Sequence, residues 1–271
     1  MRRRYAMPRL VACAVCLMLA PSVGARAGQL DEAIPWTGKR LVNLDTPGES
    51  VRGGVRFTGE LRVFGASEDM LYGNLQLGYG ASPSLEIVIR ATLAERKTFN
   101  GDGFGIRHGG TDVELLGRLR SPRYPDWALE VGLSSAATAA QDDLFLTAQA
   151  LYQRGIGPRT TFFLAPKAVF IDSNALIGIG GGVAVRLAEG LEAVGDITGM
   201  VSGDNTYSVH SGGRTRGEVW GAALRYAPPR GNRDLVLELG VTNGLGVTTG
   251  MSMTPGLGGS AAVVLGATWR R

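Results

Sequence analysis

The sequence predicts an all-β protein, a single antiparallel transmembrane β-barrel of about 12 strands with short periplasmic turns and longer extracellular loops. Three observations support this fold class. Segments of about ten residues alternate apolar with polar side chains, the gaps between them alternate in length, and aromatic residues gather near segment ends. Closing the sheet into a barrel satisfies every backbone hydrogen bond in lipid, where an open edge would be costly.

The first 27 residues have the pattern of a secretory signal peptide. Several arginines precede the apolar run from Leu10 to Ala20, and the small-x-small sequence Ala25-Arg26-Ala27 follows. This run is too short to span a bilayer as a helix, so we expect cleavage after Ala27. A lipid anchor on Cys13 is disfavoured, because the apolar core should precede such a cysteine and here it follows.

Removing this leader changes the charge and the cysteine content of the chain. The whole sequence has 28 Lys and Arg against 24 Asp and Glu, and five of the arginines lie in residues 1–27. The basic balance therefore belongs to the leader and does not indicate nucleic-acid binding. Both cysteines, Cys13 and Cys16, also leave with it. The mature chain would then have neither disulfides nor cysteine metal sites.

Period-two alternation begins at residues 51–63, where apolar residues and glycine occupy every odd position and Arg52, Arg56, Thr58, Glu60 and Arg62 alternate with them. In a strand, this pattern gives one apolar face and one charged face. Pro166 lies inside one predicted strand, where we expect a bulge because proline removes a ladder donor. The predicted strands are 51–63, 71–79, 85–93, 112–120, 127–134, 144–152, 160–170, 177–187, 191–201, 220–226, 235–241 and 261–270.

The gaps between strands favour a membrane barrel over a secreted β-sandwich. Long gaps, of which 94–110, 203–217 and 244–259 are the clearest, mostly alternate with tight turns, although the gaps after the first and seventh strands are short. Antiparallel barrels keep short turns on the periplasmic side and long loops outside. A sandwich would leave this asymmetry unexplained. The predicted organisation is a cleaved signal peptide at 1–27, an irregular periplasmic segment at 28–50, and an outer-membrane barrel at 51–271.

Two hairpin segments resemble a known family. Residues 78–87, Gly-Tyr-Gly-Ala-Ser-Pro-Ser-Leu-Glu-Ile, and residues 110–115, Gly-Thr-Asp-Val-Glu-Leu, are similar to hairpins of the porin-like family named after the phenol-degradation meta-pathway. The resemblance covers the first half of the barrel. It implies an outer-membrane transporter and transfers no site residues. The C-terminus departs from the usual barrel ending, because Arg270 and Arg271 follow the aromatic Trp269.

The polar strand faces predict a charged lumen. Two interpretations remain open: a lattice of paired charges that fills a narrow barrel, or a polar channel whose basic wall at Arg52, Arg56 and Arg62 favours small anionic solutes. Lys167 and Arg225 are expected on the same face. The predicted lumen-facing charges are Arg52, Arg56, Glu60, Arg62, Glu86, Arg90, Asp112, Glu114, Arg118, Arg120, Glu130, Arg186, Glu192, Asp196 and Glu238.

Aromatic residues near strand ends predict contact with the membrane interface, where barrels carry aromatic girdles. The expected partners are outer-membrane lipid and lipopolysaccharide, the outer-membrane insertion machinery and small polar solutes, with no nucleic acid; the sequence leaves the oligomeric state open. The predicted interface aromatics are Tyr79, Trp127, Tyr152, Trp220, Tyr226 and Trp269.

Catalytic chemistry is not expected, and neither a cofactor nor a metal site is predicted. His108 and His210 both fall in predicted loops, where a solvated histidine is the simpler interpretation. The run Ser173-Asn174-Ala175 resembles one in lipid A deacylases, but Ile171 replaces their histidine. The glycines between Gly178 and Gly182 are interpreted as a close-packing face.

The function expected from these patterns is an outer-membrane channel or porin-like transporter in a diderm bacterium. It would pass small polar or anionic solutes through the charged lumen. The alternative is a structural or adhesion barrel that acts through the loops 94–110, 203–217 and 244–259. A barrel lipid hydrolase is a weaker possibility.

Overall fold

The computed structural model describes residues 40–48, 52–64, 70–96, 111–135, 144–171, 174–207, 214–228, 235–256 and 259–271. Within those ranges, no helix is long and apolar enough to cross a membrane. The predicted signal peptide, His108, His210 and Ser173 all lie outside the described residues. The predictions that concern them are therefore not addressed by the structure.

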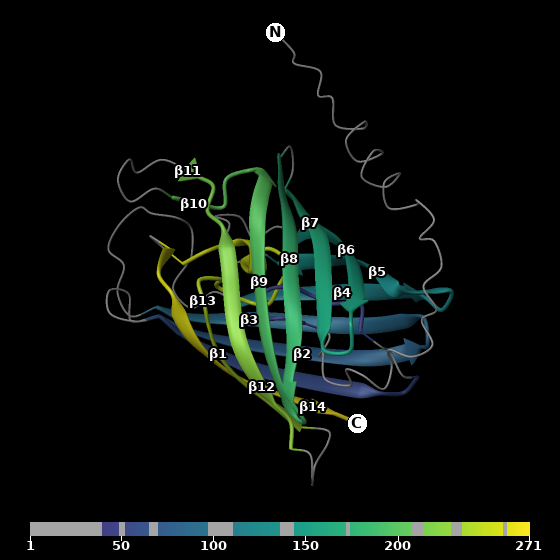
Figure 1. Ribbon diagram of the computed structural model, residues 1–271. Helices are drawn as coiled ribbons and strands as arrows, with labels where there is room; N and C mark the ends of the chain where they lie inside the picture. Colours follow the sequence, from purple (N-terminus) through teal and green to yellow (C-terminus); the bar gives the residue numbers. More distant parts are fainter. Residues whose placement is uncertain are drawn as a thin grey trace.

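The predicted fold class is confirmed, because twelve strands form a closed antiparallel barrel in which β1 pairs with β14 (Figure 1). A separate two-stranded hairpin, β10 with β11, lies in the connection between β9 and β12. The strands of the barrel are β1 (Val55–Phe64), β2 (Met70–Ser82), β3 (Leu85–Arg96), β4 (Thr111–Ser121), β5 (Tyr124–Ser135), β6 (Leu144–Ile156), β7 (Thr160–Ile171), β8 (Asn174–Ala188), β9 (Leu191–Ser202), β12 (Val219–Tyr226), β13 (Leu235–Thr242) and β14 (Ala262–Arg270). The hairpin strands are β10 (Thr206–Tyr207) and β11 (Arg214–Thr215).

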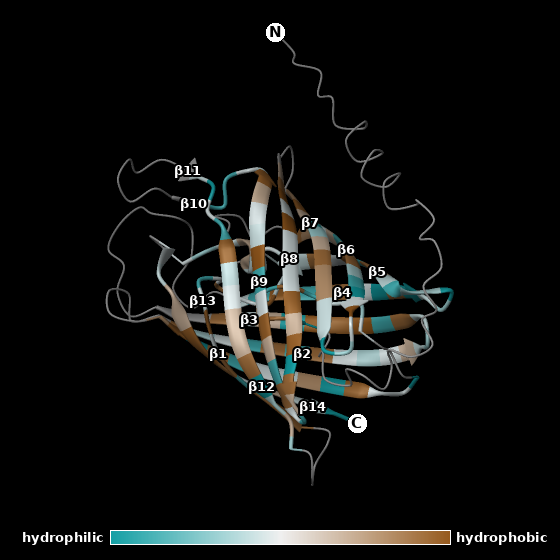
Figure 2. Cartoon of the chain, viewed as in Figure 1, coloured by the Kyte–Doolittle hydropathy of each residue, from teal (hydrophilic) through white to brown (hydrophobic). Residues whose placement is uncertain are grey.

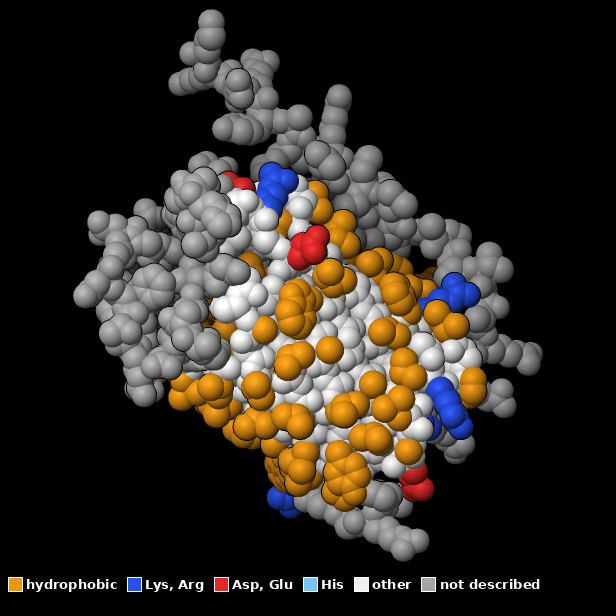
Figure 3. Space-filling model, turned by 60° about the vertical axis from the view of Figure 1, so that its left-hand side comes forward, with side chains coloured by type: hydrophobic (Ala, Val, Ile, Leu, Met, Phe, Trp, Pro, Cys, Tyr) orange, Lys and Arg blue, Asp and Glu red, His pale blue; other side chains and the backbone are white. Residues whose placement is uncertain are grey.

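Side chains alternate between the barrel interior and its outer surface, as the period of two requires. In β12, buried and exposed residues alternate without exception from Val219 to Tyr226. The colouring by hydropathy in Figure 2 changes along the strands in the same way. Figure 3 shows one side of the outer surface, where apolar side chains cover the wall and the visible charges lie towards the margins. This is the surface that a barrel presents to lipid.

The two ends of the barrel differ. We call the end that carries the tight turns after β2, β4, β6 and β8 the short-turn end, and the C-terminus lies there too, where Arg271 pairs through its backbone with Val55. The opposite end is the long-loop end. Of the six predicted interface aromatics, Trp220 lies at the long-loop end, while Tyr79, Trp127, Tyr152, Tyr226 and Trp269 lie near the short-turn end. The rings of Trp127 and Tyr152 lie against each other across paired strands, with centroids 4.5 Å apart.

Two details of the predicted strands are wrong. The first strand begins at Val55 instead of residue 51, because residues 52 and 53 form a turn in which Gly53 has a φ of 75°. The register also does not shift at Pro166, where a bulge was expected. The ladder between β6 and β7 skips the positions next to Pro166 and resumes in the same register. A proline without an N–H can be accommodated by the loss of local bonds alone.

Candidate functional site

The interior of the barrel is densely charged. Lys167 and Arg225 are buried there, as are most of the charges predicted to face the lumen. Four others are only partly buried: Glu60, Arg120, Arg186 and Glu238. Arg52 is exposed in the turn before β1, outside the barrel wall, because the ladder with β14 begins only at Arg56. The buried predicted charges are Arg56, Arg62, Glu86, Arg90, Asp112, Glu114, Arg118, Glu130, Glu192 and Asp196.

Strands β3, β4 and β5 bring two arginines and three carboxylates into one network. Arg90 lies 3.2 Å from carboxylate oxygens of both Glu114 and Glu130. Arg118 donates to Glu86 over 2.8 Å and also binds Glu130. Each carboxylate in this group therefore has a cationic partner, as buried ions require. The paired-charge interpretation describes this wall of the lumen.

A segment of the chain that precedes the barrel lies inside it. Residues 40–48, which we call the lumen segment, have buried side chains from Arg40 to Thr46. Arg40 donates to the carbonyl oxygens of Val42, Gly246 and Val247. These hydrogen bonds fold the segment back on itself and attach it to a loop more than two hundred residues later.

Asp45 ties the lumen segment to the charged wall. Its carboxylate accepts a hydrogen bond from Arg90 over 2.9 Å and another from the Gln149 amide over 2.9 Å. Burial alone would raise the pKa of Asp45, but Arg90, Arg40, Arg118 and the Gln149 amide together lower it below its ordinary value. Asp45 is thus held as an anion inside the barrel.

Asn43 forms a second attachment, on the opposite side of the lumen. Its backbone N–H and its side-chain amide both donate to the carboxylate of Asp196 on β9, over 2.7 and 3.0 Å. Its side-chain oxygen accepts from Arg62 on β1 over 2.9 Å. A single buried amide therefore connects the lumen segment to β1 and β9, and its donors and acceptor are all used.

Glycines of the wall make room for the lumen segment. A Cβ at Gly180 of β8 would collide with Leu44, and one at Gly182 would collide with Leu41. On β12, a Cβ at Gly221 would lie 2.6 Å from the Cβ of Val42. The inward glycines of β8 therefore form a close-packing face. The lumen segment packs on Gly180 and Gly182, and Met253 packs on Gly178.

A second piece of chain fills the long-loop half of the lumen. We call residues 243–256 the lumen loop; it contains the short 3₁₀ turn η2 (Met251–Met253), and nearly all of its residues are buried. The N–H of Val247 donates to Thr92 and that of Thr249 donates to Glu114, over 3.1 and 3.0 Å. Part of the predicted extracellular loop 244–259 is thus folded into the barrel, where it forms hydrogen bonds with side chains of the wall.

Lys167 of β7 joins the two inserted pieces. Its Nζ lies 3.2 Å from the carbonyl oxygen of Asn43 in the lumen segment and 3.0 Å from the hydroxyl of Ser252 in the lumen loop. Together with Arg40, this ammonium makes the two pieces one hydrogen-bonded unit. The unit closes the middle of the lumen.

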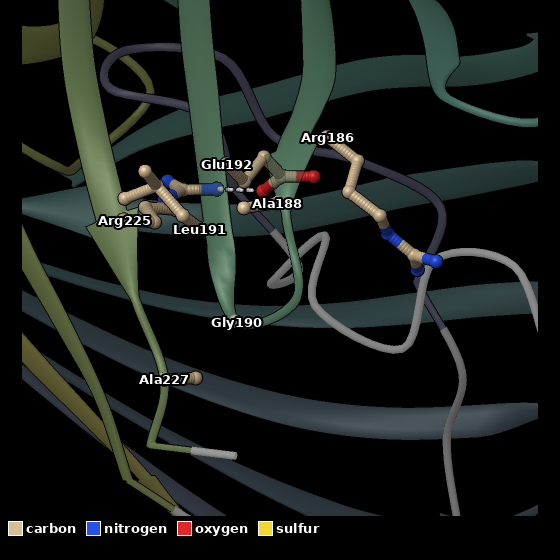
Figure 4. Close-up of a pocket in the computed structure, with 7 residues that line it drawn as sticks. All are labelled: Arg186, Ala188, Gly190, Leu191, Glu192, Arg225 and Ala227. Carbon is tan, nitrogen blue, oxygen red and sulfur yellow. Dashed lines mark ion pairs between the residues drawn. The ribbon is translucent and has the colours of Figure 1, made fainter.

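Free space remains at the short-turn end. A cavity of about 570 Å³, a volume that includes its open mouth, is lined by Arg40, Leu41, Arg56, Glu60 and Arg225, among others. We call it the vestibule. A smaller cavity of about 240 Å³ shares Arg225 with it. Figure 4 shows Arg225 pointing towards Glu192 in this smaller cavity, 4.0 Å away, while Arg186 extends away from the pair.

The sequence predicted the wall charges but did not predict the lumen segment or the lumen loop. The small inward residues of β8 were the available signal, since a strand face of glycine leaves space that something must fill. Across the residues that the structure describes, no three His, Cys, Asp or Glu side chains are grouped so as to hold a metal ion.

Comparison with solved structures identifies the same fold. An outer membrane channel from Pseudomonas putida F1 aligns with a TM-score of 0.54 at 12% identity, over 82% of this chain and 97% of the other. The NanC porin aligns with a TM-score of 0.54 at 10% identity, over 79% and 98%. At these identities the likeness shows the fold alone. No protein-family model and no curated protein sequence matches the chain.

Proposed function

We propose that this protein is a porin-like channel of the outer membrane in a diderm bacterium, and that it passes small polar or anionic solutes. The observation that carries the proposal is the chemistry of the lumen. Two inserted pieces of chain fill its centre. They are held by hydrogen bonds to polar wall residues together with the apolar packing of Leu41, Val42 and Leu44. Water can replace the hydrogen bonds if the pieces move.

The proposal includes the membrane location, the cleavage of residues 1–27 and the contacts with lipid, lipopolysaccharide and the insertion machinery. The apolar outer surface supports them (Figure 3). Membership of the porin-like family named after the phenol-degradation meta-pathway belongs to the same proposal, and the hairpins at 78–87 and 110–115 support it.

The lumen segment is the proposed gate. In the part of this segment that the structure describes, residues 40–48, Leu44 lies against Gly180 of β8. The predicted mature chain has no cysteine, so the changes Leu44→Cys and Gly180→Cys would create one designed disulfide between the gate and the wall. The two single-cysteine variants are matched controls, because each makes the same local change without a cross-link.

Planar-bilayer conductance of the double variant tests the proposal. We expect no sustained current when the disulfide is oxidised and ion current after reduction, with both single variants insensitive to the redox state. Current that is the same before and after reduction would show that the lumen segment is not the gate.

A structural or adhesion barrel is the second candidate, and the filled lumen favours it. If no folded form of the protein, cross-linked or reduced, conducts ions, the channel proposal fails and the structural role remains. Within the described residues, part of the loop expected to serve adhesion is buried as the lumen loop. An adhesion role would therefore depend on the other two loops.

A further inference from the structure

The vestibule at the short-turn end contains an arginine whose hydrogen-bonding groups are unused. Arg56 is 6% exposed. Its Nε, Nη1 and Nη2 atoms are buried, and none has a hydrogen-bond acceptor among the described residues. A buried guanidinium normally binds acceptors with most of its five N–H groups. Arg56 therefore presents an unfilled donor fork at the lining of an open cavity.

The nearest carboxylate does not satisfy Arg56. Glu86 lies 3.3 Å from its Nη2, but Glu86 is bound more closely by Arg118, over 2.8 Å. The two acids that line the vestibule also have cationic partners: Glu60 binds Arg62, and Glu238 accepts from Arg225 over 2.6 Å. The acids of the vestibule are thus already neutralised.

A second positive charge faces Arg56. In the ladder between β1 and β14, Arg56 is directly opposite Arg270, and both residues line the vestibule. Like charges opposite each other on one face of a sheet repel. On the other neighbour, β2, the residue opposite Arg56 is Gly78, which has no side chain to bind it. Arg270 thus adds a second positive charge to the lining of the vestibule.

We propose that the vestibule is a binding site for one small oxyanion, such as a carboxylate or sulfate group. Arg56 would bind it with its planar fork, which matches two oxygens at once. Arg270 would add charge, and the side chains of Gln76 and Thr58, which also line the cavity, can donate hydrogen bonds. The role of this site in selecting anionic solutes rests on the proposed channel function. Binding of the anion itself does not require conduction.

Isothermal titration of the intact protein in detergent with sodium sulfate and with sodium acetate tests the site, using sodium chloride at matched ionic strength as reference. We expect saturable binding, and we expect Arg56→Gln to weaken it by about tenfold or more because charge-assisted bonds are lost. Arg270→Gln should weaken it less. Arg52→Gln is the matched control, since Arg52 lies close in sequence but in an exposed turn.

Absence of saturable binding to the unaltered protein would overturn the proposal, and so would an equal loss of binding in Arg52→Gln. If Arg56→Gln does not fold, crystals of the unaltered protein soaked in selenate give a second test. An anomalous peak beside Arg56 supports the site, and selenate found only elsewhere overturns it. A protein that binds sulfate but never conducts would refute the channel and leave the site standing.

Discussion

Leu44 of the lumen segment occupies the space that a side chain at Gly180 of β8 would need. This contact links the occlusion of the barrel to a single missing Cβ in its wall. Because Leu44 and Gly180 are far apart in the sequence, only closure of the barrel brings them together.

Replacing Gly180 by valine should displace the lumen segment. We expect Gly180→Val to cost about 1 to 3 kcal/mol of stability through overpacking and to raise single-channel current. Limited proteolysis of residues 40–48 and conductance measure the two effects. Gly181→Val is the control, because a Cβ at Gly181 meets only one backbone oxygen, 3.9 Å away. Equal behaviour of the two variants would contradict the packing argument.

Lys167→Met should loosen both inserted pieces together. The variant removes the ammonium that contacts Asn43 and Ser252 while keeping similar bulk. We expect backbone hydrogen exchange to become faster in the lumen segment and in the lumen loop alike. The folded protein should lose about 1 to 3 kcal/mol of stability. Faster exchange in only one of them would show that the two pieces move independently.

Acid should break the attachment of Asp45 to the charged wall only at low pH. Because the pKa of Asp45 is lowered in the folded protein, its contribution to stability is complete above the unfolded value of about 3.9 and is lost as pH falls through the lowered value. We expect the Asp45 attachment to persist at about pH 4. Asp45→Asn should weaken closure already at neutral pH. Conductance recorded against pH for both proteins checks this, and opening of the unaltered protein between neutral pH and pH 5 would argue against it.

An arginine introduced on the apolar outer surface of the barrel should lower the stability of the folded protein. Leu61 lies in the middle of β1 and is 37% exposed on the apolar surface. We expect Leu61→Arg to cost about 2 to 4 kcal/mol in lipid vesicles, with a smaller effect for Phe57→Arg nearer the strand end. Urea unfolding measures the cost. Ser121→Arg, at the exposed end of β4, should be close to neutral. A similar cost for all three would mean that this face does not meet lipid.

Much of the wall could be predicted because each strand carries its own signal. The alternation along β1 or β12 depends on neighbours two residues apart, and it marks which face is apolar without reference to any other strand. Strand boundaries were less certain: Arg52 continues the alternation, but Gly53 adopts a turn that the pattern does not encode. The predicted bulge at Pro166 is also wrong, because the effect of the proline depends on which ladder its missing N–H would join.

By itself, the sequence determined the barrel, its approximate strand number and the charged character of its interior, since these follow from local periodicity. Only the tertiary structure decided that the lumen is closed, and by which residues. Asn43 binds Asp196 and Arg40 binds the carbonyl of Val247 across long separations in the chain, and residues 40–48 have no repeating pattern that points to these partners. Such contacts depend on the shape of the space inside the closed barrel, and that space exists only once all the strands have paired.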